Sequence, residues 1–279
     1  GCGSGAVTAA LLARHPDIVA TAIDTSPAAV ALTRENCVKF GVADRVRIFQ
    51  VDASTYVPSL PGSLTPAEAA DPRTDVSGPA LHSLSVPSRT AVPAGQAGID
   101  MVVANPPYIP TAEMADLEPE VAKWEDRRAL DGGTPAGLGV TLSWLRSIAA
   151  GWWVRPAAPI FLETHSTHPA LLAHLLSELP PNMVRSRAGG AGGEEPPPHY
   201  VAPEDQDIGW LQARTGLDDD ALAALVTACE PLRESFEFVS GYEDHTQTPR
   251  FVHLRRTDPS IKEAKEDAVV FALTLLGGL

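Results

Sequence analysis

Short apolar segments alternate with helical segments along the chain, and this alternation constrains the fold more than any other feature. Residues 18–23 form an apolar run, and residues 27–40 follow as a predicted helix with Ser26 as its N-cap and Gly41 at its end. The other predicted elements are strands at 46–51, 99–104, 159–162, 235–240 and 251–254, and helices at 6–14, 141–150 and 170–179. This order predicts an α/β fold with a doubly wound, mostly parallel sheet, whose last two strands are antiparallel.

Two stretches rich in proline and glycine interrupt this pattern. Residues 58–98 hold seven prolines and show neither helical nor strand periodicity. Residues 186–207 contain runs of glycine, glutamate and proline. Such stretches bury too little apolar surface to offset the entropy lost on ordering, so we interpret both as flexible insertions. The sequence then predicts one domain over residues 1–257, followed by a C-terminal tail over residues 258–279.

Composition excludes several classes of protein. Lys plus Arg is 21 and Asp plus Glu is 35, so the net charge of −14 argues against a protein that binds nucleic acid by neutralising phosphates. No apolar run approaches the roughly 18 residues of a membrane span, so no membrane segment is expected. The three cysteines, Cys2, Cys37 and Cys229, form no paired motif, so neither a disulfide framework nor a metal site is expected.

A glycine-rich segment at residues 1–5 precedes a helical run and suits a tight turn that brings the backbone close to a ligand. Asp24 closes the next strand, about 20 residues on, where a carboxylate can accept hydrogen bonds from ribose hydroxyls. Asp52 ends the strand after that and could accept a hydrogen bond from an adenine amino group. A structural turn is the alternative for the glycines, but the glycine segment and Asp24 together favour a nucleotide-type site. Taken by itself, Asp52 is more often a plain strand-end acid.

A glycine segment of this kind normally follows a buried strand, and the sequence shows no strand before Gly1. We therefore expect the chain to be a fragment without that strand, and any targeting segment to lie upstream of Gly1. The neighbours of a missing central strand would expose unpaired backbone groups. On this interpretation the chain alone should be unstable or aggregate.

The tetrapeptide Asn105-Pro106-Pro107-Tyr108 directly follows the apolar strand predicted at residues 99–104. The two prolines end the strand, because neither can donate to a ladder. The side-chain oxygen of Asn105 and the carbonyl of Pro106 could both accept hydrogen bonds from a planar NH2 group, and the Tyr108 ring could pack on it. A simple turn is the alternative, which the glycine segment and the two strand-end acids make weaker.

These motifs together resemble S-adenosylmethionine-dependent methyltransferases of the HemK/PrmC type, which methylate glutamine in proteins. The matching segments are residues 1–5, 24–27, 34–36, 41–46, 52, 105–110, 129–133 with 137–138, and 161–165. The resemblance implies a seven-stranded, Rossmann-like methyltransferase sheet whose first strand is missing from this chain. On the same resemblance, we expect this chain to lack the family's N-terminal helical domain, which helps to dock its protein substrate.

The resemblance implies transfer of a methyl group from S-adenosylmethionine to the side-chain nitrogen of the glutamine in the GGQ motif of a peptide chain release factor. The cofactor-binding residues it implies are Gly1, Cys2, Gly3, Ser4, Gly5, Asp24, Thr25, Asp52, Ala53 and Asn105. The substrate-binding residues it implies are Asn105, Pro106, Pro107 and Tyr108, of which Asn105, Pro106 and Tyr108 also have a catalytic role. We expect a monomer whose partner is the release factor, in the mitochondrion or the cytoplasm.

Three alternatives share parts of this pattern. An amino methyltransferase that acts on adenine in DNA or RNA has the same tetrapeptide, but the negative charge of the chain weighs against it. A nicotinamide-dependent dehydrogenase would use the glycine segment but not the tetrapeptide. A degenerate, non-catalytic domain could retain the fold as a binding scaffold, although intact Asn105 and Asp24 argue against loss of activity. Among minor candidates, Glu163 lies at a strand end, and His165 and His168 are interpreted as loop-surface residues.

Overall fold

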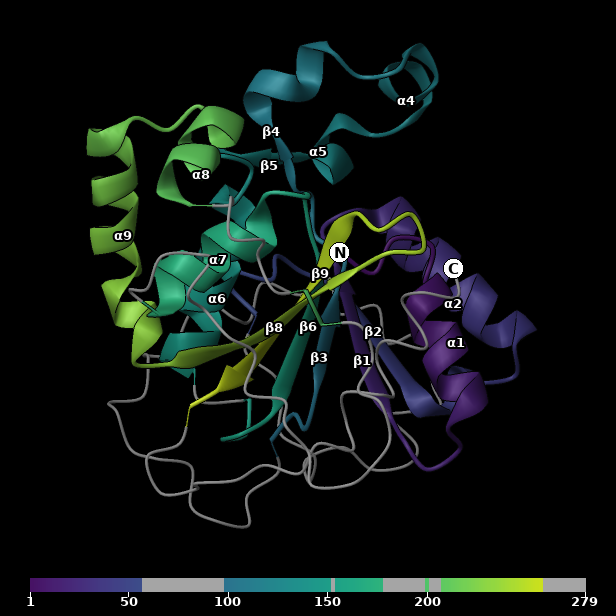
Figure 1. The fold of residues 1–279 in the computed structure, drawn as a ribbon. Helices are drawn as coiled ribbons and strands as arrows, with labels where there is room; N and C mark the ends of the chain where they lie inside the picture. The colour runs from purple at the N-terminus through teal and green to yellow at the C-terminus, as the bar shows by residue number, and fades with distance from the viewer. Residues whose placement is uncertain (57–97, 152–153, 178–198, 201–206, 258–279) are drawn as a thin grey trace. The chain divides into compact units, whose positions relative to one another are not determined.

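A computed structural model describes residues 1–56, 98–151, 154–177, 199–200 and 207–257 (Figure 1). The described residues form two compact units. The first unit takes its residues from 1–99 and 150–153, and the second from 100–149 and 154–279. Most of the interpreted insertion at 58–98, much of the one at 186–207, and the tail at 258–279 lie outside the described residues.

The first unit is a parallel strand pair with two helices. Its elements are α1 (Ala6–Arg14), β1 (Ala20–Asp24), α2 (Pro27–Lys39), η1 (Ala43–Arg45) and β2 (Val46–Gln50). β1 and β2 pair in parallel, from Ala20 opposite Val46 to Asp24 opposite Gln50, so both strands end at the same edge. A buried apolar cluster joins α1, α2 and the segment after α2 through Ala9, Leu12, Cys37 and Val42.

The ends of α2 follow the sequence signals. The Ser26 hydroxyl accepts a hydrogen bond from Ala29 N at 3.3 Å, and Pro27 occupies the first turn, where a missing N–H costs nothing. Gly41, with φ of 68°, takes the left-handed conformation that ends many helices. The predicted N-cap and terminator of this helix are therefore confirmed.

The second unit is built on a five-stranded mixed sheet in the order β3-β6-β9-β8-β7. Its strands are β3 (Val102–Ala104), β6 (Pro159–Glu163), β7 (His199–Tyr200), β8 (Phe236–Glu243) and β9 (Pro249–Arg256). β3 and β6 are parallel, whereas β9 is antiparallel to both β6 and β8, as expected for the two closing strands. β7 lies inside the stretch interpreted as an insertion and pairs with β8.

Four helices accompany this sheet: α6 (Gly139–Gly151), α7 (His168–Ser177), α8 (Ile208–Thr215) and α9 (Asp219–Arg233). α7, which Figure 1 shows as a ribbon, packs on β8 and α9. Nearly all of its side chains are buried. Phe161 of β6 joins Tyr242 and Phe251 in a buried cluster. β6 is thus an apolar strand between β3 and β9, and it ends at Glu163.

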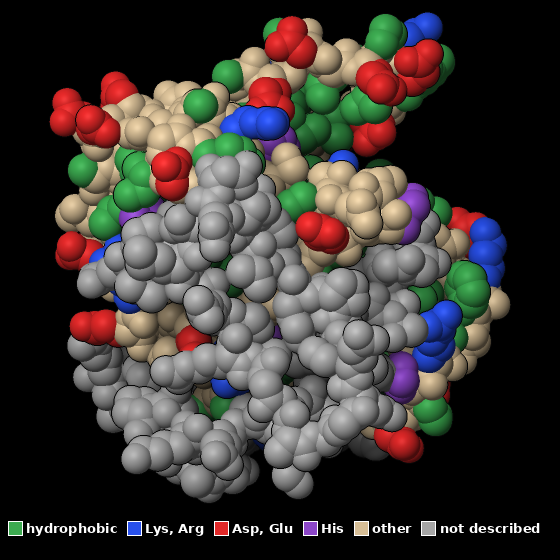
Figure 2. Space-filling view, viewed as in Figure 1, with side chains coloured by type: hydrophobic (Ala, Val, Ile, Leu, Met, Phe, Trp, Pro, Cys, Tyr) green, Lys and Arg blue, Asp and Glu red, His purple; other side chains and the backbone are tan. Residues whose placement is uncertain are grey.

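A smaller parallel pair, β4 (Ile109–Pro110) with β5 (Asp131–Gly133), follows the tetrapeptide. Between its strands lie η2 (Thr111–Ala115), α4 (Pro119–Trp124) and α5 (Arg127–Leu130). Acidic side chains crowd the surface over α4 and over the start of α9 (Figure 2). The exposed acids there include Glu118, Glu120 and Glu125 beside α4, and Asp218, Asp219 and Asp220 at α9.

The α/β class, with its parallel pairing and antiparallel closing strands, is confirmed. The described strands occupy separate sheets, with β1 and β2 in one and β3 at the edge of another. No described helix is both long enough and apolar enough to cross a membrane. Among the described residues, no group of three or more His, Cys, Asp or Glu side chains could hold a metal ion.

Candidate functional site

The glycine-rich segment of the first unit is tied to the end of β1. Cys2 N donates to Ile23 O at 2.9 Å, and Gly3 N donates to the Oδ2 atom of Asp24 at 2.9 Å. The other carboxylate oxygen of Asp24 accepts a hydrogen bond from Ser26 N at 2.8 Å. Asp24 is only 8% exposed, so its first structural role is to anchor the glycine segment.

Thr33 of α2 holds the same segment from the other side, and sequence reasoning missed it. Its buried hydroxyl donates to Gly3 O at 3.1 Å and lies 3.2 Å from the sulfur of Cys2, which leaves the thiol to donate to Thr33. Gly5 has φ of 76°, and a Cβ there would lie 2.7 Å from Thr33 Cγ2, so only glycine fits. Burial raises the pKa of the Cys2 thiol.

Asp52 lies just after β2, and its environment differs from that of Asp24. It is exposed, and its Oδ1 atom accepts hydrogen bonds from Ser54 Oγ at 2.6 Å and Ser54 N at 2.7 Å. These bonds lower the pKa of Asp52, the hydroxyl contributing most. No described group bonds the Oδ2 atom, so an ionised oxygen remains available to a ligand.

The nine cofactor residues predicted within the first unit therefore gather around one edge of its strand pair. They come from the loop before α1, from the end of β1 with Thr25, and from the turn after β2 with Ala53. Gly3, at φ of 57°, has open space where a Cβ would stand. Gly5 is the N-cap of α1 and has no side chain to cap it, so no side-chain cap satisfies the first-turn N–H groups.

In the second unit, the tetrapeptide follows the end of β3 as predicted. Asn105 is exposed and its side chain bonds no described residue, whereas Pro106, Pro107 and Tyr108 are half-buried. The amide of Asn105 is therefore open to solvent, while the three residues after it are partly packed. Asn105 belongs to the second unit, so its role as a bridge between cofactor and substrate stays a prediction.

Residues 131–139, which we call the glycine clasp, hold the backbone after the tetrapeptide. β5 lies within it and pairs with β4, placing Asp131 opposite Ile109. A Cβ on Gly137 would lie 2.3 Å from Tyr108 O, and a Cβ on Gly132 would lie 2.8 Å from Tyr108 Cα and 2.1 Å from Gly137 O. Only glycine permits this approach, which explains the glycines noted in residues 129–138.

The Tyr108 hydroxyl lies between the carboxylate of Glu163 and the guanidinium of Arg250. It donates to Glu163 Oε1 at 3.2 Å and accepts a hydrogen bond from Arg250 Nη1 at 3.3 Å. Burial raises the pKa of Tyr108, the negative charge of Glu163 raises it further, and Arg250 opposes both. The strand-end position predicted for Glu163 is confirmed, whereas Arg250 was not predicted.

The loop-surface interpretation is wrong for His168, whereas His165 does lie in the loop before α7. His168 is fully buried at the start of α7, since that helix is apolar on nearly every face. Its Nε2 atom lies 2.8 Å from Ala136 O, and its Nδ1 atom accepts a hydrogen bond from His165 N at 3.3 Å, so the neutral ring carries its proton on Nε2. His165 is half-buried and lies 3.3 Å from Glu113 of η2.

We expect the second unit to lose stability below pH 6.5. Burial lowers the pKa of His168 to about 3, whereas an unfolded histidine titrates near 6.5. The stability from this group is therefore complete above pH 6.5 and falls by roughly 1.4 kcal/mol per unit as the pH drops toward 3. Urea unfolding between pH 7.5 and 4.5 measures the slope. This slope reports the number of protons taken up on unfolding, and His168→Gln should lower that number by about one. An unchanged slope would contradict the assignment.

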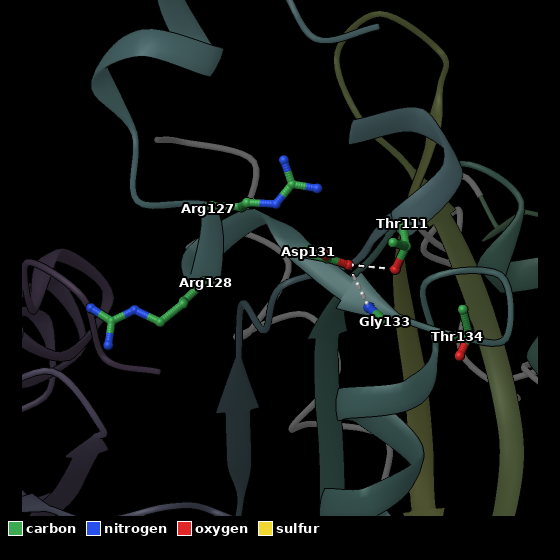
Figure 3. A pocket seen from close by; sticks show the side chains of 6 residues that line it. All are labelled: Thr111, Arg127, Arg128, Asp131, Gly133 and Thr134. Atoms are coloured by element: carbon green, nitrogen blue, oxygen red, sulfur yellow. Dashed lines mark hydrogen bonds between the residues drawn. The ribbon is translucent and has the colours of Figure 1, made fainter. Parts of the chain in front are cut away.

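An open depression of about 650 Å³ lies beside the glycine clasp, as Figure 3 shows. The residues that line it are Thr111, Arg127, Arg128, Asp131, Gly133 and Thr134. Asp131 Oδ1 accepts hydrogen bonds from Thr111 Oγ1 at 2.7 Å and Gly133 N at 3.0 Å, which lower the pKa of Asp131. Asp131 thereby links η2 to β5, and the residues that make this link also form part of the wall of the depression.

The parts described above are a glycine segment and two strand-end acids on one parallel pair, and an Asn-Pro-Pro-Tyr segment after another, which is the combination expected of a Rossmann-like methyltransferase. The sequence comparisons agree. The chain is 31% identical over 195 residues to the MTRF1L release factor glutamine methyltransferase of Homo sapiens, covering 69% of this chain and 47% of that protein. It is 32% identical over 162 residues to the release factor glutamine methyltransferase of Geobacter sulfurreducens, covering 58% and 39% respectively. The chain is thus a homologue of the release factor glutamine methyltransferases.

The chain spans about half or less of the length of these curated relatives, 47% and 39%. No family model matches it. Among solved structures, a proposed rRNA methylase from Clostridium thermocellum aligns over 92% of this chain and 85% of its own, with 12% identity and a TM-score of 0.37. A similarity this weak adds nothing to the fold that the strand order defines.

Proposed function

We propose that the protein transfers a methyl group from S-adenosylmethionine to the side-chain amide nitrogen of the glutamine in the GGQ motif of a peptide chain release factor. The observation that carries the proposal is the exposed Asn105 directly after β3, whose side chain bonds no described residue, in a chain whose curated relatives are named for this reaction. The clasped backbone of Tyr108 fixes the segment from its other end.

In this reaction the main task of the protein is to position the glutamine amide for attack on the methyl group. A carboxamide nitrogen is a weak nucleophile because its lone pair is delocalised, and the cofactor would supply a methyl group on positively charged sulfur. Asn105 Oδ1 and the Pro106 carbonyl are acceptors that could hold both N–H bonds of the glutamine amide. As the nitrogen gains positive charge, these acceptors stabilise the transition state more than the ground state. The nitrogen can release its proton afterward, so no strong base is required beforehand.

The first unit has groups that fit the cofactor. The uncapped first turn of α1 suits the carboxylate of the methionine part, and the open face of Gly3 admits a close backbone approach. Asp24 would accept hydrogen bonds from ribose hydroxyls, with the lone pairs that Gly3 and Ser26 leave free. Asp52 would accept a bond from the adenine amino group, next to Ala53.

Asp24→Asn is expected to weaken S-adenosylmethionine binding by roughly ten- to a hundredfold. The substitution removes the charge that strengthens the ribose bonds, and it points an NH2 group at the N–H of Gly3 or Ser26. Calorimetric titration measures the affinity. Asp44→Asn, at an exposed acid of η1 in the same unit, is the matched control and should bind normally. Unchanged affinity in Asp24→Asn would refute the ribose assignment.

The function is tested by incubating the full chain with labelled S-adenosylmethionine and either a release factor or nucleic acid. Label on the GGQ glutamine, absent when that glutamine is replaced by alanine, supports the proposal. Label on adenine instead would establish the nucleic-acid alternative. Cofactor binding without transfer to either substrate would indicate a non-catalytic binding domain.

A further inference from the structure

The hydroxyl of Tyr108 has both of its hydrogen-bonding functions occupied by charged side chains. Its single proton goes to Glu163 Oε1 at 3.2 Å, and its oxygen accepts a hydrogen bond from Arg250 Nη1 at 3.3 Å. Two partners on a phenol oxygen restrain both the place of the ring and its rotation about the long axis. Tyr108 is thus held at its backbone by the glycine clasp and at its tip by this pair.

The sheet brings the two charged residues together from distant parts of the sequence. β6 and β9 are antiparallel with Glu163 opposite Phe251, so Arg250 lies at the end of β6. Its carbonyl accepts hydrogen bonds from Thr164 N at 2.7 Å and Thr164 Oγ1 at 3.1 Å. The backbone of Arg250 is therefore fixed where the residues after β6 begin.

The turn between β8 and β9 directs the Arg250 side chain. Arg250 Nε lies 3.6 Å from Asp244 Oδ2, an ion pair longer than a hydrogen bond, and this buried Nε atom has no hydrogen-bond partner in the described part of the chain. Asp244 is itself fixed, since its Oδ1 atom accepts hydrogen bonds from Thr246 N at 2.8 Å and Thr248 N at 3.1 Å. A chain of contacts thus runs from this turn through Arg250 to the phenol.

We propose that Arg250 and Glu163 are positioning residues that act through the Tyr108 hydroxyl and hold its ring face toward the substrate amide. The proposal rests on the proposed function, because it assigns Tyr108 to the glutamine pocket. It also determines how Tyr108 works: with its proton committed to Glu163, the phenol is not a proton acceptor for the reaction. The raised pKa of Tyr108 agrees, since the phenol stays protonated at neutral pH.

Methyl-transfer kinetics test the positioning role. Arg250→Met and Tyr108→Phe should each lower kcat roughly ten- to a hundredfold, the range for a hydrogen bond to a charged group, with S-adenosylmethionine affinity unchanged. Because Arg250 acts through the hydroxyl, the double variant should lose no more than Arg250→Met alone. Arg250→Lys, which keeps the charge, should recover part of the rate. Additive losses, or full activity of Tyr108→Phe, would overturn the proposal.

A spectroscopic readout separates this proposal from the proposed function. In the full chain labelled with 13C-tyrosine, Arg250→Met should raise the pKa of Tyr108 and Glu163→Gln should lower it, because the two charges act in opposite directions. Arg255→Met is the control: Arg255 lies on the same strand but faces Glu237 at 3.6 Å, and its loss should leave the Tyr108 titration unchanged. Titrations unmoved in both test variants would overturn the proposal. Opposite shifts in a protein that methylates nothing would leave the network standing and refute the function.

Discussion

Asn105→Ala should lower the rate of methyl transfer by about a hundredfold or more while S-adenosylmethionine still binds. The side chain is exposed and bonds no described residue, so its loss removes no hydrogen bond to the described part of the second unit. What disappears is an acceptor for the developing positive charge on the glutamine nitrogen, and such an interaction contributes several kcal/mol in a shielded site. Single-turnover kinetics with a release factor measure the rate, and calorimetry measures the affinity.

Asn36→Ala provides the contrast. Asn36 Nδ2 donates to Ser4 O at 2.8 Å and so supports the glycine segment of the first unit. Its loss should weaken cofactor affinity, with turnover at saturating cofactor close to normal. If Asn105→Ala turned over at a near-normal rate, Asn105 would not hold the reacting amide, and the mechanism would be wrong.

The second large effect is expected for Gly137→Ala, which should destabilise the second unit by about 3 kcal/mol or more and abolish methyl transfer. Gly137 has φ of 78°, and the new Cβ would lie 2.3 Å from Tyr108 O and 2.9 Å from Pro110 N. Backbone strain at positive φ costs roughly 1–2 kcal/mol, and overpacking adds roughly 1–3 kcal/mol. Relief would require the backbone of Tyr108 to move, which displaces the substrate-binding residues.

Gly216→Ala is the matched control for this experiment. Gly216 ends α8 in the same unit with φ of 69°, but nothing lies within 4 Å of the added Cβ. Gly216→Ala should lower the free energy of unfolding only by the backbone strain at positive φ, roughly 1–2 kcal/mol, and should retain methyl transfer. Urea unfolding gives both free energies. Equal destabilisation by the two substitutions would mean that the close approach to Tyr108 does not constrain the clasp.

Local signals predicted the local structure well. The N-cap Ser26, the terminating Gly41 and the strand that stops at Asn105 each depend on chemistry within a few residues, so the sequence shows them directly. Some boundaries moved by one or two residues, as with α7, which begins at His168 rather than residue 170. β4 and β5 are too short to show any periodicity and were not predicted.

Residues that act across the fold were missed for a different reason. Arg250 bonds Tyr108 across a separation of 142 residues, and only the antiparallel pairing of β9 with β6 brings them together. Thr33 is similar, because an ordinary helical threonine becomes a support for the glycine segment only when α2 packs beside it. Burial, and not sequence, likewise determines the neutral state of His168.

The covered thiol beside Thr33 has a chemical consequence for a protein that handles an alkylating reagent. A thiolate attacks a sulfonium methyl readily, whereas a protonated thiol does not. Burial raises the pKa of Cys2 and so favours the protonated form further, with the hydrogen directed to the threonine oxygen. The segment that would hold the methyl donor thus carries its thiol in the form that is the poorer nucleophile.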